Sequence, residues 1–223
     1  AHNADVPVFF LGRKIAFPDP RHAEPDGLLA VGGDLSAGRL LEAYRRGIFP
    51  WPWAEDQPLT WYSPPLRCVF EPGRFRANRS FRRTLRSGRF ECRINTHFDD
   101  IILACAQIKR PGQSGTWITD DIISAYRRLH RMGHAHSVET WYHGQLAGGL
   151  YGLALGGAFF AESMFHREAD ASKFAIHSLS EILLARGFAM IDAQVPSKFL
   201  LALGATTLTR TNFLTRLRDA LAL

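Results

Sequence analysis

The sequence predicts an α+β protein, with a small loop-rich N-terminal domain over residues 1–64 and a larger domain with a mixed central sheet over residues 65–223. Pro and Gly are dense in residues 18–73, which indicates loops with little regular structure. Further along the chain, runs of alternating residues separated by glycine-containing turns predict antiparallel strands. A helix then separates the strands predicted at 158–165 and 188–195, so these two form a right-handed βαβ unit with parallel strands.

One short helix fits the N-terminal domain. Ser36 can cap its first turn, and Gly47 ends it. Its apolar face is formed by Leu40, Leu41 and Tyr44. The consecutive prolines of the string YSPPL exclude helix and stiffen the chain, so we place the domain boundary there.

The larger domain has a clearer rhythm of strands and helices. Thr119 and Thr211 can cap helices, whereas Gly133, Gly187 and Gly204 can end them. The first half of the domain is predicted to contain a strand at 90–95, a helix at 98–108, a loop at 110–115 and a helix from Thr119 to Gly133. Three strands follow at 136–142, 145–155 and 158–165. The domain then continues with a helix at 171–186, a strand at 188–195, a short helix, a strand at 206–210 and a final helix.

The charge of the chain is concentrated in its middle third. The net charge is +6 and the pI about 9.6, and residues 67–93 contain nine Arg and no Lys. The forked guanidinium group of Arg binds phosphate well, and phenylalanines lie between these arginines. We therefore favour an RNA or polyphosphate partner over the alternative that the arginines only form a solvent-exposed charged surface. Three distant cysteines without a C-x-x-C pair, no membrane-length apolar run and no signal peptide predict a cytoplasmic protein.

The order of strands resembles the acyl-CoA N-acetyltransferase superfamily. In that superfamily two parallel strands splay apart around the acyl donor, and a glycine-rich loop after the first of them binds the pyrophosphate of coenzyme A. The corresponding segment here, HREADASK (166–173), has no glycine, so its backbone amides could not approach a pyrophosphate closely. The fold resembles an acetyltransferase, but the coenzyme A signature is missing.

Polar residues on the two parallel strands are candidates for chemistry. Period-two alternation places Phe160, Glu162 and Met164 on one face, and Asp192 and Gln194 share a face on the neighbouring strand. We expect Glu162, Asp192 and Gln194 to converge on a cleft with apolar walls, where a carboxylate can hold a cation or accept a proton. The alternative is that the two acids lie at a wet strand edge and bond to backbone.

Loop tryptophans and a histidine group complete the candidates. The tryptophans either wall an apolar pocket or cover the core. Gly133 interrupts the helix that a metal site built from the histidines would need, so we expect no metal site. The residues concerned are Trp51, Trp53 and Trp117, and His130, His134 and His136.

Taken together, many strings resemble one family, the leucyl/phenylalanyl-tRNA–protein transferases. They run in order from residue 15 to about residue 195, across both predicted domains, and only the set is specific. The strings are IAFPDP, EPDGLLAVGGDLS, LLEAYRRGIFPW, YSPPLR, GTWIT, AYRRLHRMGHAHSVETW, GGLYG, ESMF, ASK and IDAQV.

The resemblance implies an activity. Members take Leu or Phe from aminoacyl-tRNA and join it to the N-terminal Arg or Lys of a protein, which marks that protein for degradation. Because an apolar pocket discriminates one methylene by only about 1–3 kcal/mol, we also expect some acceptance of Met. The resemblance implies a small N-terminal domain beside an acetyltransferase-like (GNAT-type) domain, and no metal or other cofactor. We also expect a monomer that does not bind membranes.

The resemblance also assigns residues by position. Asp192 and Gln194 match the pair that acts on the attacking amine, and Glu162 lies at the polar rim of the pocket. The pocket for the Leu or Phe side chain maps onto Trp51, Trp117, Leu150, Phe159, Leu179, Leu183 and Ile191, and the grip on the tRNA acceptor stem onto Arg79, Arg82, Arg83 and Arg86. The stretch PSKFLLALGA departs from the family, because Ser197 and Phe199 stand where Asn and His are usual.

The donor ester is already activated, so positioning the amine beside it is the main task of the enzyme. An amide is no base, so we expect Gln194 to orient the amine, while Asp192 either orients Gln194 or accepts the proton. The cation near Glu162 is the α-amino group of the donor or the side chain of the acceptor. An acyl-CoA N-acetyltransferase and a non-catalytic RNA-binding module remain the rival functions.

Overall fold

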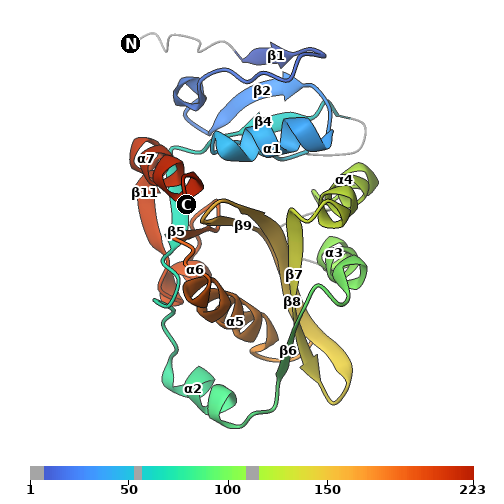
Figure 1. Cartoon of the computed structure of the whole chain (residues 1–223), viewed down its shortest axis with the longest axis vertical. Helices are drawn as coiled ribbons and strands as arrows, with labels where there is room; N and C mark the ends of the chain where they lie inside the picture. Colours follow the sequence, from blue (N-terminus) through green and yellow to red (C-terminus); the bar gives the residue numbers. More distant parts are fainter. Residues whose placement is uncertain (1–7, 53–56, 109–115) are drawn as a thin grey trace.

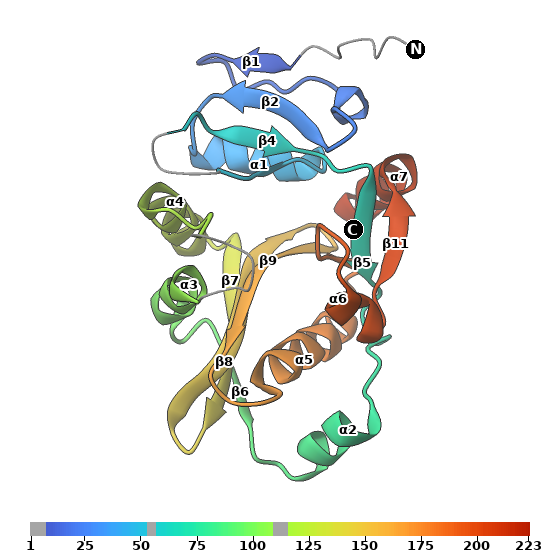
Figure 2. The ribbon, with the colours of Figure 1, turned by 180° about the vertical axis from the view of Figure 1, so that it is seen from behind.

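A computed structural model describes residues 8–52, 57–108 and 116–223, and it contains two β-sheets (Figures 1 and 2). The smaller sheet has the order β1-β2-β4-β3, and the larger one β11-β5-β10-β9-β8-β7-β6. The chain passes from the first sheet to the second through the prolines of YSPPL. The larger sheet is mixed and flanked by helices, which confirms the predicted α+β class.

The smaller sheet was not predicted, because its strands are short and lie among Pro and Gly. It is built from β1 (Phe9–Leu11), β2 (Leu28–Gly32), β3 (Phe49–Pro50) and β4 (Thr60–Tyr62), with a 3-10 turn at Pro20–His22. Helix α1 (Ala37–Arg45) packs against it, and Ser36 caps this helix as predicted, since its hydroxyl accepts a hydrogen bond from the Arg39 amide at 3.4 Å.

The larger sheet follows the predicted order with one insertion. Its strands are β5 (Leu66–Phe70), β6 (Glu91–Ile94), β7 (Ala135–Tyr142), β8 (Gln145–Leu155), β9 (Ala158–His166), β10 (Met190–Asp192) and β11 (Thr206–Thr209). Strands β9 and β10 are parallel, as predicted, and the unpredicted β5 lies antiparallel between β10 and β11. The strand expected at 188–195 ends at Asp192, because Gln194 adopts a left-handed backbone conformation (φ 59°).

Helices cover both faces of this sheet. The 15-residue helix α5 (Ala171–Ala185) lies on one face, and α3 (Phe98–Gln107) and α4 (Asp120–Arg131) lie on the other (Figure 1). Helix α2 (Arg79–Arg86) was not predicted, and α6 (Lys198–Ala202) and α7 (Arg210–Leu221) complete the fold. Thr119 caps α4 as predicted.

The predicted cap of the last helix is wrong. Thr209, not Thr211, caps α7, because strand β11 ends there and the Thr209 hydroxyl accepts from the Asn212 amide at 3.3 Å. The extended backbone of Thr209 is typical of a cap, so the helix starts two residues earlier than expected.

One hydrophobic cluster joins the two sheets. Leu29 and Trp61 of the smaller sheet belong to the same buried cluster as Tyr126 of α4 and Phe160 of β9. The smaller sheet is therefore packed onto the larger one, and the division at residue 64 stays a prediction. In the described part of the chain, no helix has the length and apolar character that spanning a membrane requires.

Candidate active site

Glu162 occupies a β-bulge in strand β9. Tyr151 of β8 pairs with Ser163, and the next residue, Gly152, pairs with Ala161, so Glu162 is the extra residue. A Cβ atom at Gly152 would lie 2.1 Å from the Phe160 carbonyl oxygen, which only glycine avoids. The bulge therefore depends on the glycine opposite it.

The bulge overturns the predicted alternation of side chains beyond residue 162. Met164 packs with Phe159 in the cluster on the α5 side, whereas Phe165 joins Phe160 in the other cluster. The prediction that Met164 shares a face with Phe160 is wrong, because the extra residue in β9 reverses the orientation of every side chain after it.

Glu162 stands in a chain of buried hydrogen bonds. Gln194 Nε2 donates to Glu162 Oε1 at 2.8 Å, and the Tyr126 hydroxyl donates to Oε2 at 3.1 Å. The Tyr126 hydroxyl also contacts the hydroxyl of Tyr44 from α1. The predicted convergence of Glu162 and Gln194 is present, and two tyrosines that sequence reasoning missed extend it towards the smaller sheet.

Burial changes the ionisation of this chain. It raises the pKa of Glu162 to about 8, although the hydroxyls of Tyr44 and Tyr126 lower that pKa. Burial also raises the pKa values of Tyr44 and Tyr126 well above the usual range. Glu162 therefore keeps its proton to a higher pH than an ordinary carboxyl group does.

Asp192 does not face the same space as Glu162. It forms a buried, two-pronged ion pair with Arg67 of β5, with Nε–Oδ1 at 2.9 Å and Nη2–Oδ2 at 2.6 Å. Its Oδ1 also accepts from the backbone amide of Gln194 at 2.9 Å. Asp192 thus fixes the backbone that carries Gln194.

Arg67 is a further residue that sequence reasoning misplaced. It counted among the nine arginines of the predicted RNA-binding stretch, yet only 1% of it is exposed. Its guanidinium lies between the rings of Phe49 and Phe213, at 4.8 and 4.3 Å from their centroids, and donates to the Gly47 carbonyl at 2.8 Å. Its role is therefore internal.

An apolar cavity of about 590 Å³ opens beside Glu162 and Gln194. Trp51 and Trp117 form one wall, and their ring centroids lie 6.4 Å apart. Leu150 of β8 also lines it. Sequence reasoning missed the other lining residues, which are Phe49, Pro50, Ile108, Ala161, Ser163, Met164, His166, Ser172, Ala193, Val195, Pro196, Ser197, Phe199 and Leu200.

Four predicted pocket residues do not line this cavity. Phe159, Leu179, Leu183 and Ile191 are buried in the cluster between α5 and the sheet. Leu150 belongs to that cluster and also lines the cavity, so the four lie behind its wall. Their assignment to the side-chain pocket stays a prediction. Trp53 and the loop at 110–115 lie outside the described residues.

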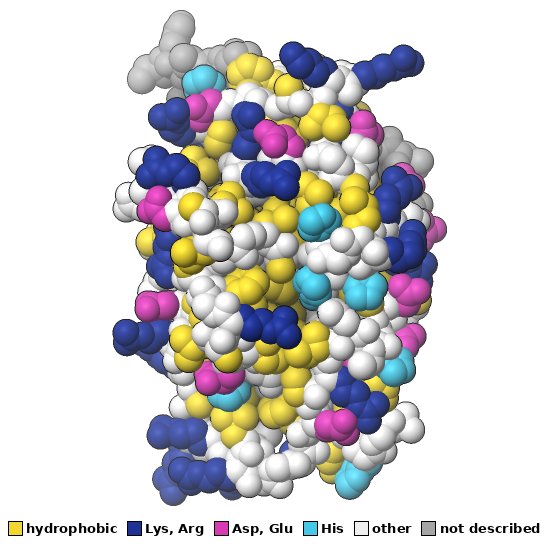
Figure 3. Space-filling view, in the orientation of Figure 1, with side chains coloured by type: hydrophobic (Ala, Val, Ile, Leu, Met, Phe, Trp, Pro, Cys, Tyr) yellow, Lys and Arg dark blue, Asp and Glu magenta, His cyan; other side chains and the backbone are white. Residues whose placement is uncertain are grey.

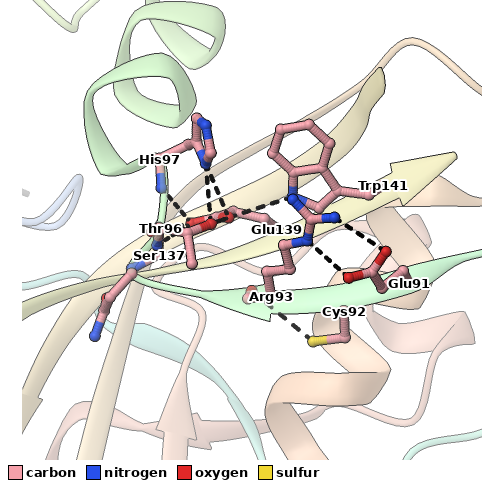
Figure 4. A network of polar contacts seen from close by, with 9 residues as sticks. Glu91, Cys92, Arg93, Thr96, His97, Ser137, Glu139 and Trp141 are labelled. Carbon is pink, nitrogen blue, oxygen red and sulfur yellow. Dashed lines mark hydrogen bonds and ion pairs between the residues drawn. The ribbon is translucent and has the colours of Figure 1, made fainter. Parts of the chain in front are cut away.

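A second buried carboxylate shows what a purely structural role looks like (Figure 4). Glu139 of β7 accepts from the amides of Thr96 and His97 at 2.8 Å, from the Ser137 hydroxyl at 3.0 Å and from the Trp141 indole at 3.3 Å. Burial raises the pKa of Glu139, but these bonds outweigh it and lower the pKa below its ordinary value. Glu139 is thus a fixed anion that anchors the start of α3, unlike Glu162.

The predicted tRNA-binding arginines lie on helix α2. Asn78 caps this helix by accepting from the Phe81 amide at 2.8 Å. Phe81 is buried, whereas the four arginines are exposed, and Lys and Arg side chains gather over α2 at the lower left of Figure 3. They are Arg79, Arg82, Arg83 and Arg86.

The three candidate histidines lie at the end of α4, in the connection that follows it and in β7, and His130 packs on the core. His130 stacks on Phe98 with centroids 4.1 Å apart and shares a hydrogen bond of 2.8 Å with the Ala135 carbonyl, and His136 contacts Asn95 at 3.0 Å. Within the described ranges, no group of three or more His, Cys, Asp or Glu side chains could hold a metal ion.

The comparison with known families assigns the chain. A model of the leucyl/phenylalanyl-tRNA protein transferase family matches residues 69–218, and a model of the N-terminal domain of that family matches residues 33–65. The chain belongs to the leucyl/phenylalanyl-tRNA protein transferase family. The predicted resemblance is therefore confirmed.

Relatives from the leucyl/phenylalanyl-tRNA–protein transferase family match almost the whole chain. The transferase of Solidesulfovibrio magneticus is 50% identical over 215 residues, 96% of this chain and 87% of its own length. That of Anaeromyxobacter sp. (strain Fw109-5) is 51% identical over 214 residues, 96% of this chain and 91% of its own length. The transferase of Aromatoleum aromaticum is 55% identical over 199 residues, which are 88% of this chain and 83% of its own length.

Solved structures similar to this transferase family member are more distant. A ribosomal-protein-alanine N-acetyltransferase from Brucella melitensis is 14% identical, with a TM-score of 0.36, over 49% of this chain and 82% of its own. A GCN5-related N-acetyltransferase from Kribbella flavida is 10% identical, with a TM-score of 0.42. The match covers 76% of this chain and 60% of the acetyltransferase chain. Likenesses of this size carry no argument about function.

Proposed function

We propose that this protein transfers Leu or Phe, and Met less well, from aminoacyl-tRNA to the N-terminal Arg or Lys of acceptor proteins, which marks them for degradation. The observation that carries the proposal is the cavity beside Glu162 and Gln194, whose walls are apolar and whose rim is polar. Membership of the transferase family supports the donor and the acceptor classes. The protein acts in the cytoplasm, as a monomer, without a cofactor.

The cavity accounts for the choice of donor. Trp51, Trp117 and Leu150 offer the donor side chain an apolar surface that rejects polar side chains. A volume of about 590 Å³ is typical of sites for drug-sized ligands, so it accommodates an aminoacyl group with part of the terminal nucleoside. A difference of one methylene is worth only about 1–3 kcal/mol, which explains why Met is also accepted.

The rim accounts for the reaction. The neutral amine of the acceptor attacks the ester carbonyl carbon, the new C–N bond forms, and the bond from that carbon to the ribose oxygen breaks. The proton lost by the amine replaces the acyl group on the ribose hydroxyl, so the overall exchange needs no cofactor. Gln194 orients the amine by hydrogen bonding, and bringing amine and ester together supplies much of the acceleration.

Asp192 and Arg67 hold Gln194 in position and do not contact the substrate themselves. The Asp192 carboxylate holds the Gln194 amide at 2.9 Å, and its ion pair with Arg67 keeps that carboxylate in place. Glu162 holds the side-chain amide of Gln194 at 2.8 Å from the other side. A cation that enters the cavity favours the ionised form of Glu162, so substrate binding lowers its pKa.

The arginines of α2 hold the acceptor stem of the tRNA. Their guanidinium groups are exposed along one short helix, and phosphate contacts of this kind make binding strongly dependent on salt. The base-paired stem then lies over α2, while the single-stranded end carries the amino acid to the cavity.

The deciding experiment measures transfer of radiolabelled Leu from charged tRNA to a peptide with N-terminal Arg. The controls are the same peptide with an N-terminal Glu, the peptide with an acetylated N-terminus, and acetyl-CoA as the donor. We expect transfer to the Arg peptide alone. Gln194→Ala should slow it at least tenfold while Leu-tRNA still binds.

Other results would contradict this function. Acetylation of the peptide would show an acyl-CoA N-acetyltransferase, and binding of tRNA without any transfer would show an RNA-binding module. Equal use of Ile-tRNA and Leu-tRNA would contradict the assignment of the cavity, because a β-branched side chain should fit a narrow apolar space poorly.

A further inference from the structure

Residues 166–173 run from the end of β9 into the first turn of α5, and they contact both the cavity and the segment that contains α2. His166 and Ser172, near the two ends of this stretch, line the cavity beside Glu162. Glu168 and Asp170, between them, contact the segment that contains α2. This is the stretch HREADASK, which has no glycine where an acyl-CoA acetyltransferase would bind pyrophosphate, and which the transfer reaction leaves without a role.

Asp170 is the centre of the contact with α2. Its Oδ2 accepts from the Thr84 hydroxyl of α2 at 2.9 Å, and its Oδ1 accepts from Lys173 Nζ at 2.7 Å. Asp170 has a left-handed backbone conformation (φ 70°), which Asp and Asn adopt more readily than most residues. Glu168 adds an ion pair with Arg89, just after α2, with Oε2–Nη2 at 3.3 Å.

The other attachment of α2 leads to the same helix α5. Phe81, the buried residue of α2, packs against Phe75 and His177, with ring centroids 5.7 and 6.0 Å apart. His177 lies on α5, so the aromatic attachment and the Thr84–Asp170 bond tie α2 to one element and its entry segment. These two attachments hold α2 against α5 and its first turn, which border the cavity.

We propose that residues 166–173 set the position of the tRNA-binding helix relative to the aminoacyl cavity, and that Asp170 is a positioning residue that acts through Thr84. This inference rests on the proposed function. A tRNA held by α2 reaches the cavity at a fixed distance, so a shift of α2 moves the ester away from Gln194. A misplacement of about 1 Å is enough to slow an enzyme about a hundredfold.

The proposal predicts a defined kinetic signature for Thr84→Val. The substitution keeps the shape of the side chain but removes the hydroxyl that donates to Asp170, whereas Thr84→Ser keeps that donor. We expect Thr84→Val to lower kcat with Leu-tRNA about tenfold and to leave KM for Leu-tRNA within twofold, because the arginines still bind phosphate. Thr84→Ser should match the unaltered protein.

Two comparisons separate positioning from binding and from general damage. Arg82→Ala, which removes a phosphate contact, should raise KM for Leu-tRNA and reduce the salt dependence of binding. Phenylalanyl-adenosine, a 3′-ester without the rest of the tRNA, cannot reach α2, so Thr84→Val should inhibit neither its binding nor its turnover. Asp170→Asn alone, which keeps an acceptor oxygen for Thr84 and tolerates the backbone conformation, should keep most of the rate that Thr84→Val loses.

Each outcome decides one of the two proposals. If the unaltered protein transfers no Leu from tRNA, the proposed function fails. If it does transfer Leu and Thr84→Val changes neither kcat nor KM, the segment does not position α2 and this inference alone fails. A loss of the same size with Leu-tRNA and with phenylalanyl-adenosine, or in Thr84→Ser as well as Thr84→Val, would also overturn it.

Discussion

Replacing Arg67 by Met should leave the buried Asp192 carboxylate without its ion-pair partner. The side chain of Arg67 is 1% exposed and that of Asp192 is fully buried, and two short hydrogen bonds, 2.9 and 2.6 Å, join them. Methionine keeps an apolar stem between the rings of Phe49 and Phe213 but offers no donor. The substitution therefore isolates the ionic contribution from packing.

The size of the effect follows from burial. Breaking a buried ion pair from one side costs about 3–5 kcal/mol, because the remaining charge stays without a partner. The Gly47 carbonyl loses its donor as well. We expect Arg67→Met to lower the free energy of unfolding by about 4 kcal/mol, and the Tm by roughly 8–16 °C for a chain of 223 residues.

Urea unfolding followed by tryptophan fluorescence measures this loss. The matched control is Arg127→Met, because Arg127 pairs with Asp99 at 3.0 Å but the Asp99 side chain is 65% exposed. An exposed pair of this kind is worth less than about 1 kcal/mol. The double variant Arg67→Met/Asp192→Leu removes both charges, so it should recover stability relative to Arg67→Met without recovering transferase activity.

Two results would refute this reasoning. Equal losses in Arg67→Met and Arg127→Met would mean that the Asp192 carboxylate is solvated in the folded protein. A double variant that is less stable than Arg67→Met would mean that the unpaired carboxylate was not the cause of the loss.

Three further predictions test other parts of the site. Raising the pH from 4.5 to 8 should lower stability, because folded Glu162 keeps its proton up to a pKa of about 8 whereas the unfolded side chain loses it near 4.5. Thermal melts of Glu162→Gln should therefore depend less on pH in this range, and an unchanged profile would contradict burial as the cause. Leu150→Trp should fill the cavity and reduce kcat/KM more for Phe-tRNA than for Leu-tRNA, since Phe is larger; equal kcat/KM values for the variant and the unaltered protein would place the side-chain pocket elsewhere. Arg86→Ala should reduce the slope of log affinity against log salt by about 1 in filter binding of tRNA, and an unchanged slope would remove Arg86 from the interface.

The sequence predicted correctly those features that depend on residues close together in the chain, such as two helix caps and one parallel pair of strands. Ser36 and Thr119 cap their helices as expected, because a cap depends on the two or three residues that follow it. The helix between β9 and β10 fixed the parallel pairing of these strands, and with it the approach of Glu162 to Gln194.

The rest depends on contacts that no local pattern contains. Arg67 and Asp192 are 125 residues apart in the chain, so the residues next to either one do not predict their ion pair. The bulge at Glu162 arises from the fit between β8 and β9, and period-two alternation assumes that no such residue exists. Helix α2 is short, and its apolar face consists only of Phe81 and Leu85, although Asn78 before it and Gly88 after it were usable signals for its ends.

Residues of the N-terminal region contribute directly to the candidate active site. Trp51 supplies a wall of the cavity, and Tyr44 closes the chain of hydroxyls that runs through Tyr126 to Glu162. The N-terminal region therefore helps to bury the Glu162 carboxylate, and burial is the main cause of the rise in its pKa.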